Sequence, residues 1–141
     1  GHSAGGNLIM LAATQKDVHV DGCITLSAVW DINDMIKNAE DDFNERTSYP
    51  IFGTNNNERV KYSPSAFLEN VSRPLFIAIG GRDYPYLQKQ AEYIDKEYER
   101  IGKEHEYMIV PGYIHSDMAT RFGSYGDILL PRIVKFVRSH S

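Results

Sequence analysis

The chain has 141 residues, of which 42% are hydrophobic and 24% charged, and its formal net charge at pH 7 is −4. This composition is ordinary for one globular unit, and its negative balance argues against nucleic acid as a partner. No apolar run approaches the ~20 residues that a membrane span requires. Cys23 is the only cysteine and lies in an apolar run, so we expect a buried, unpaired thiol in a strand.

The chain begins at Gly1-His2-Ser3, without an initiator methionine and inside a recognisable motif. We therefore interpret it as the C-terminal portion of a longer protein. A cytoplasmic location is the working expectation, and the start inside a motif leaves room for a signal peptide upstream.

Predicted helices and strands alternate along the chain, which is typical of an α/β fold with a mostly parallel sheet flanked by helices. A helix is expected over 7–15 and an apolar strand over 22–29. The stretch 31–62 is polar and acidic, then rich in asparagine, and it is too long for a simple connection. We predict that 1–141 belongs to a single domain and that 31–62 is an insertion or lid with helical pieces.

The second half of the chain carries the clearest elements. Ser63-Pro64 marks a helix start, and a buried strand is expected over 75–79. Apolar residues at helical spacing then predict an amphipathic helix from Leu87 to Ile101, with Gly102 as its C-cap. A strand over 106–110 and an amphipathic helix over 128–137 complete the pattern.

The first five residues, Gly1-His2-Ser3-Ala4-Gly5, fit the Gly-x-Ser-x-Gly pattern of a nucleophile elbow. Such an elbow is a sharp strand-to-helix turn, so we expect Gly1 and Gly5 to be required because larger side chains would collide. Ser3 would then lie at a helix N-terminus, where the Ala4 N–H is a candidate oxyanion-hole donor. The pattern alone is only moderately specific, since a glycine-rich turn with an idle serine looks the same.

In α/β-hydrolases the nucleophile, the acid and the base follow one another in that order, with acid and base in turns just beyond strand ends. Asp83 follows the strand 75–79 and is the favoured acid, while His115 follows the strand 106–110 and is the favoured base. Asp31 follows the strand 22–29 and stays open as the rival acid. Asp83 is preferred because its glycine-flanked turn suits an inward-reaching side chain.

The other histidines are weaker candidates for the base. His2 is adjacent to Ser3, but its position in the elbow is expected to point it elsewhere. His19 and His105 precede strands, which puts them at the opposite end of the sheet, facing solvent.

Several segments together carry a family resemblance: Gly1-His2-Ser3-Ala4-Gly5-Gly6-Asn7-Leu8, Ser27-Ala28-Val29-Trp30-Asp31, Ser63-Pro64, Gly80-Gly81-Arg82-Asp83 and Gly112-Tyr113-Ile114-His115. Over nearly its whole length the chain resembles the hormone-sensitive-lipase and feruloyl-esterase-like branches of the α/β-hydrolases. It also resembles kynurenine formamidases and, more distantly, prolyl-oligopeptidase-type peptidases. The resemblance implies the C-terminal half of an α/β-hydrolase fold and a catalytic triad of Ser3, Asp83 and His115.

The implied activity is a serine carboxylesterase for small or short-acyl esters, which forms an acyl-enzyme and needs neither a metal nor an organic cofactor. An arylformamidase or prolyl-oligopeptidase-like amide hydrolase with the same triad is an alternative. So is a non-catalytic binding protein on the same scaffold, although the retained His115 speaks against it.

Trp30 and Phe52 are expected to wall the substrate pocket. A homodimer through the last strand or the C-terminal helix is a further possibility, because such enzymes dimerise in this way. The family's His-Gly-Gly oxyanion stretch is not found in these residues, so we expect the 141 residues by themselves to be inactive.

Overall fold

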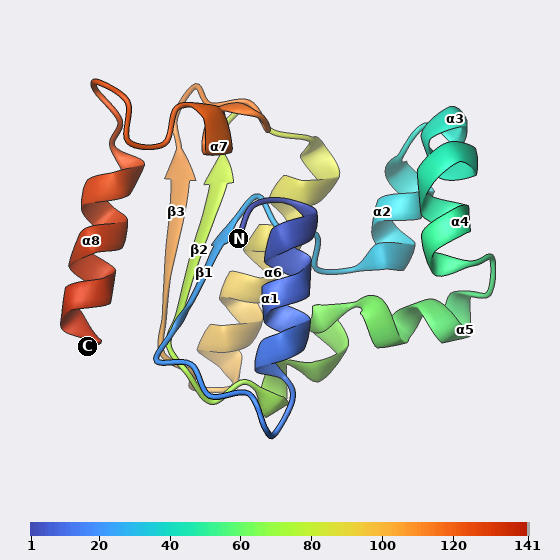
Figure 1. The fold of residues 1–141 in the computed structure, drawn as a ribbon, viewed down its shortest axis with the longest axis horizontal. Helices are drawn as coiled ribbons and strands as arrows, with labels where there is room; N and C mark the ends of the chain where they lie inside the picture. Colours follow the sequence, from blue (N-terminus) through green and yellow to red (C-terminus); the bar gives the residue numbers. More distant parts are fainter. Residues whose placement is uncertain (141) are drawn as a thin grey trace.

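The computed structural model describes residues 1–140 and contains a parallel sheet of three strands in the order β1-β2-β3 (Figure 1). The strands are β1 (Cys23–Leu26), β2 (Leu75–Gly80) and β3 (His105–Val110). The first residues of the chain extend this pairing beyond β1, because the Ser3 N–H donates to the Leu26 carbonyl at 2.9 Å and the Leu26 N–H to the Gly1 carbonyl at 2.8 Å. The parallel α/β architecture predicted from the sequence is confirmed.

Helices cover both faces of the sheet (Figure 1). On one face lies α8 (Leu129–Ser139), and on the other lie α1 (Ala4–Ala13) and α6 (Pro85–Arg100). Every residue of β2 is buried, and its side chains alternate between the two layers: Phe76 and Ala78 pack with α8, while Leu75 and Ile77 pack with α1 and α6. Burying a large apolar side chain is worth about 1.5–3 kcal/mol, so this central strand anchors both layers.

Two helices differ at their starts from the sequence prediction. Helix α1 begins at Ala4, three residues before the expected position, because the chain turns directly from its pairing with β1 into the helix. Helix α6 begins at Pro85, whose fixed φ suits the first helical turn, and it ends before Gly102 at φ +69° as predicted.

Strand β1 is shorter than the apolar run that predicts it. It ends at Leu26, because Ser27 takes a left-handed backbone conformation with φ +50°. Cys23 is buried in this strand as a free thiol, as expected.

The connection from β1 to β2 consists of short helices. They are α2 (Ile32–Asn38), α3 (Asp41–Phe43), the π-helical turn η1 (Asn44–Ser48), α4 (Tyr49–Phe52), α5 (Asn56–Arg59), and the 3₁₀ turns η2 (Val60–Tyr62) and η3 (Pro64–Asn70). Residues 31–62, predicted above as an insertion or lid and called the insertion segment below, extend to the side of the sheet beyond α1 and α6 (Figure 1). The buried side chain of Asn7 in α1 binds the backbone on both sides of this segment. Its Nδ2 donates to the carbonyls of Val29, just before the segment, and of Tyr62, its last residue, at 2.9 Å each.

The connection from β3 to α8 runs over the carboxyl ends of the strands and contains one short helix, α7 (Asp117–Thr120). Among residues 1–140, no helix combines the length and the apolar character that crossing a membrane requires.

Candidate active site

Ser3 lies in a sharp turn between the residues that pair with β1 and the first turn of α1. Its backbone has φ +52° and ψ −121°, a conformation that residues other than glycine rarely adopt. Holding a residue there costs of order 1–3 kcal/mol, which the surrounding structure must over-determine. The turn is the geometry that the Gly-x-Ser-x-Gly pattern predicts.

Of the two glycines in the pattern, only Gly1 is needed for the expected reason. A Cβ on Gly1 would collide with the Gly5 carbonyl, as expected, but a Cβ on Gly5 would meet nothing within 4 Å. The close approach falls on Gly6 instead, where a Cβ would lie 2.6 Å from the Cβ of Ala28. The expectation that Gly5 must be small is therefore wrong for these residues, because α1 packs on the end of β1 through Gly6.

The loops that follow β2 and β3 are bound to each other. The Gly81 N–H donates to the Val110 carbonyl at 2.8 Å, and the Arg82 N–H donates to the Tyr113 carbonyl at 2.9 Å. A Cβ on Gly80 would lie 2.5 Å from the Tyr113 carbonyl oxygen, so only glycine permits this approach. The glycine-flanked turn thus brings the side chain after β2 to the side chain after β3.

Three sequence-predicted residues form one hydrogen-bonded relay. His115 Nε2 lies 2.9 Å from Ser3 Oγ, and His115 Nδ1 lies 2.9 Å from Asp83 Oδ1. Because the carboxylate can only accept, Nδ1 carries the proton and the Nε2 lone pair faces the serine hydroxyl. This tautomer is the one in which an imidazole can take a proton from Ser3.

Asp83 is buried, with none of its side chain exposed to solvent. Burial by itself raises the pKa of the Asp83 carboxyl, but hydrogen bonds from His115, Ser27 and the Tyr84 N–H outweigh it and leave that pKa below its ordinary value. Asp83 is therefore a carboxylate at neutral pH, as an acid that orients a histidine must be.

The ring of His115 contacts two other aromatic rings. The ring centroids lie 4.7 Å apart for His2 and 5.3 Å apart for Tyr84. His2 also donates from Nε2 to the His115 carbonyl at 2.9 Å, and burial lowers the pKa of the His2 imidazole. As expected, His2 does not point to Ser3; it contacts the backbone and the ring of His115 instead, a contact that the sequence did not predict.

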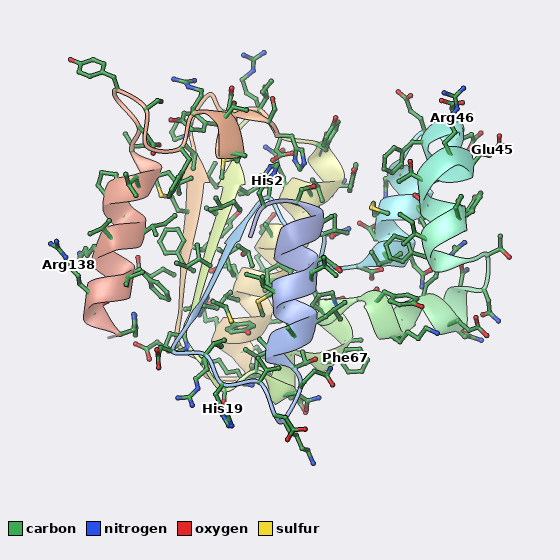
Figure 2. All side chains as sticks on the ribbon, in the orientation of Figure 1. His2, His19, Glu45, Arg46, Phe67 and Arg138 are labelled. Carbon is green, nitrogen blue, oxygen red and sulfur yellow. The ribbon has the colours of Figure 1, made fainter. Side chains whose placement is uncertain are left out.

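The remaining histidines lie away from this relay. Figure 2 shows His19 at the opposite end of the sheet from His2, as predicted. His105 begins β3, and its side chain is largely buried rather than facing solvent, because Nε2 bonds Asp95 at 3.0 Å.

Asp31, the rival acid, has a different role. Its Oδ1 accepts the Asp34 N–H at 3.0 Å and so caps the N-terminus of α2. The neighbouring Gln90 accepts the Asp31 N–H and fixes the same corner. The structure therefore joins Asp83, and not Asp31, to His115.

A cavity of about 460 Å³ contains Ser3 and His115. The other residues that line it come from the loop after β1, the insertion segment and the start of α6: Val29, Met35, Asn38, Ala39, Glu40, Phe43, Tyr84, Tyr86 and Leu87. The two pocket residues expected from the sequence are not among them. Trp30 is 1% exposed in the core, and Phe52 packs against Tyr62 with 5.4 Å between ring centroids.

The family model described as "Prolyl oligopeptidase family" matches residues 1–141. The chain belongs to the prolyl oligopeptidase family. No match was found among curated protein sequences.

Solved structures with similar folds include the acylaminoacyl peptidase of Pyrococcus horikoshii, with 22% identity and a TM-score of 0.74 over 85% of this chain and 20% of that one. A hormone-sensitive lipase from a metagenome library has 20% identity and a TM-score of 0.75 over 100% of this chain and 53% of that one. Esterase B from Lactobacillus rhamnosis has 16% identity and a TM-score of 0.72 over 99% and 51%. These likenesses confirm the α/β-hydrolase fold for this member of the prolyl oligopeptidase family.

The chain therefore spans about a fifth of the peptidase and about half of the lipase and the esterase. In residues 1–140 no group of three or more histidine, cysteine or acidic side chains is placed to hold a metal ion.

Two residues that contact the relay were not predicted from the sequence of this prolyl oligopeptidase family member. Ser27, at the end of β1, donates to Asp83, and Tyr84 packs beside His115. A hydroxyl at the end of an apolar strand, next to the carboxyl end of β2, was the available signal for Ser27.

Proposed function

We propose that the protein is a serine hydrolase that cleaves carboxylic esters with small or short acyl groups, with Ser3 as nucleophile, His115 as base and Asp83 as acid. The observation that carries the proposal is the relay of two 2.9 Å contacts from Ser3 through His115 to a buried carboxylate. Its second support is the strained backbone of Ser3 at the start of a ten-residue helix.

In the first half of the reaction Ser3 Oγ attacks the ester carbonyl while its proton moves to His115 Nε2. Asp83 holds Nδ1–H and stabilises the imidazolium that results. The proton then passes to the alcohol oxygen as the C–O bond breaks, which leaves an acyl group on Ser3. In the second half His115 takes a proton from water, the hydroxide oxygen attacks the acyl carbonyl, and Ser3 recovers its proton as the acid leaves.

The negative charge that develops on the carbonyl oxygen needs donors. Ala4 is the first residue of α1, so its N–H has no acceptor within the helix and lies at the positive end of the helix dipole. We assign the Ala4 N–H as one oxyanion donor.

The cavity next to Ser3 has a size that is ordinary for a small-molecule site. Its volume of about 460 Å³ is bounded by Met35, Phe43 and Leu87. Residues 35–43 belong to the insertion segment, which we propose acts as a wall or lid of the substrate site. This volume accommodates a small ester, and esterase B from Lactobacillus rhamnosis shares the fold.

A peptide or amide substrate is the second candidate. It is favoured by the match to the prolyl oligopeptidase family over residues 1–141. The same triad serves both reactions, and an amide places a greater demand on His115 to protonate the leaving nitrogen.

The test is hydrolysis of p-nitrophenyl esters from acetate to long acyl chains by the full-length protein, beside matched p-nitroanilides and N-formylanilide. We expect turnover that falls with acyl length and that drops to the background rate in Ser3→Ala, while Ser72→Ala, an exposed serine before β2, keeps full activity. Faster cleavage of the anilides would move the amide candidate to the front. No Ser3-dependent turnover and no labelling of Ser3 by a fluorophosphonate would leave a binding protein on a hydrolase scaffold.

A further inference from the structure

Ser27 is the second residue with a strained backbone in this site. In residues 1–140, Ser3 and Ser27 are the only residues other than glycine with positive φ, and Ser27 has φ +50°. Such a conformation favours glycine or asparagine over serine. A strained serine beside the proposed triad points to a role for its side chain, because glycine would adopt the same backbone conformation without strain.

The Ser27 hydroxyl donates its proton to the carboxylate of Asp83. Ser27 is 1% exposed, and its Oγ donates to Asp83 Oδ2 at 2.5 Å. Its backbone is held in turn, since its N–H donates to the Ala78 carbonyl of β2 at 2.8 Å. The short contact therefore runs from a fixed point on the sheet to the carboxylate.

The two oxygens of Asp83 divide their partners. Oδ1 accepts from His115 Nδ1 at 2.9 Å and from the Tyr84 N–H at 2.7 Å, whereas Oδ2 accepts from Ser27 alone among the described residues. Without the Ser27 hydroxyl, Oδ2 would be a buried charged atom with no donor. The carboxylate would then gain by rotating Oδ2 toward the donors that now hold Oδ1.

We propose that Ser27 is a positioning residue for the acid: its hydroxyl fixes the rotation of the Asp83 carboxylate so that Oδ1 faces His115 Nδ1. The role in turnover rests on the proposed function, since it acts on the reaction only through Asp83 and His115. The strain at φ +50° is the consequence of placing a hydroxyl donor at the end of β1.

Two variants separate the hydroxyl from the backbone. Ser27→Gly leaves Asp83 Oδ2 without a donor but also relieves the strain at φ +50°. These two effects on stability oppose each other, so we expect a melting temperature close to that of the parent protein. Ser27→Thr keeps the hydroxyl but puts a β-branched residue at positive φ, so we expect a lower melting temperature. A purely structural role for Ser27 predicts that Gly keeps activity and Thr loses it.

The positioning role predicts the reverse order in the full-length protein, with rates normalised to active sites titrated by a fluorophosphonate. For p-nitrophenyl acetate, Ser27→Gly should lower kcat about 10-fold with KM unchanged, the scale of losing one hydrogen bond to a charged group during the reaction. Ser27→Thr should keep kcat per active site within about twofold, provided that it folds. A kcat for Ser27→Gly equal to that of the parent would overturn the proposal.

A second readout does not depend on turnover. The proton on His115 Nδ1 gives a low-field NMR signal when a carboxylate holds it, and its assignment follows from its absence in His115→Gln. We expect Ser27→Gly to shift or broaden this signal at unchanged melting temperature. An identical signal would show that Asp83 needs no help from Ser27. If the parent protein lacks Ser3-dependent turnover, the proposed function fails while this measurement still decides the role of Ser27.

Discussion

Two aspartates that follow neighbouring strands make different contacts in this chain. Asp83 reaches His115 from a glycine-flanked turn, while Asp31 turns back on its own chain to cap α2. Both follow a strand, and the sequence favours Asp83 only through the glycines beside it. What separates them is the close approach of Gly80 to Tyr113, which draws the loops after β2 and β3 together.

Asparagine substitutions test this difference with nearly the same change of shape. Asp83→Asn should lower kcat by about 10⁴-fold, the scale of losing the acid from a Ser-His-Asp triad. Asp31→Asn should leave kcat within about twofold, because asparagine caps a helix as well as aspartate does. The measurement is ester turnover of both variants at equal folded concentration. A large loss in Asp31→Asn with little loss in Asp83→Asn would reverse the assignment.

At this scale the sequence predicted the residues that a linear pattern can carry. The Gly-x-Ser-x-Gly motif and the order serine, aspartate, histidine placed Ser3, Asp83 and His115, which the structure brings together. Contacts that depend on backbone strain or on packing between loops were not predicted, because a linear pattern gives at most a weak signal for them. Ser27 at φ +50° and the tilted contact between the His2 and His115 rings belong to this kind.

Among the elements, those with strong periodicity were predicted well. The central strand over 75–79 and the amphipathic helix ending at Gly102 appear as β2 and α6. The insertion segment was predicted only as a segment with helical pieces. Its helices are short, three to seven residues, so no amphipathic period can develop to show which side faces the cavity.

The two phenylalanines of the insertion segment illustrate this limit. Phe43 in α3 lines the cavity that contains Ser3, whereas Phe52 in α4 packs against Tyr62. Phe43→Ala should therefore widen the cavity and raise kcat/KM for hexanoate relative to acetate by about 10-fold, since a few methylenes in an apolar site are worth that much.

Phe52→Ala is the matched control, with the same loss of a ring from the same segment. Its hexanoate-to-acetate ratio should stay at the value of the parent protein, although its melting temperature should fall. The measurement is the p-nitrophenyl ester series on both variants. A changed ratio in Phe52→Ala alone would return the acyl pocket to the residue that the sequence suggested.

The whole molecule explains why residues distant in sequence meet at one site. All three strands are parallel, so their carboxyl ends lie at the same end of the sheet, and each is followed by a residue of the site: Ser27, Asp83 and His115. Ser3 reaches the same place because the residues before it pair with β1. Figure 1 shows the turns after β2 and β3 above the carboxyl ends of the strands, next to the start of α1. The arrangement follows from topology, and alternation of helices and strands was enough to predict it.

The surroundings of β1 and of Ser3 determine what these 141 residues can do by themselves. Beyond the short pairing with His2, the outer edge of β1 has no neighbouring strand among the described residues, and Ala4 is the one oxyanion donor that we assign. Losing a single oxyanion donor lowers kcat by about 10²–10³-fold. The chain spans about half the length of the lipase and the esterase that share its fold.

We therefore predict that the 141 residues, expressed by themselves, hydrolyse p-nitrophenyl acetate no faster than their own Ser3→Ala variant, even where circular dichroism shows helix and strand. The full-length protein serves as the positive control at the same active-site concentration. Ser3-dependent turnover by the isolated residues would contradict this prediction. It would mean that the Ala4 N–H and the relay of Ser3, His115 and Asp83 form a working site without further donors.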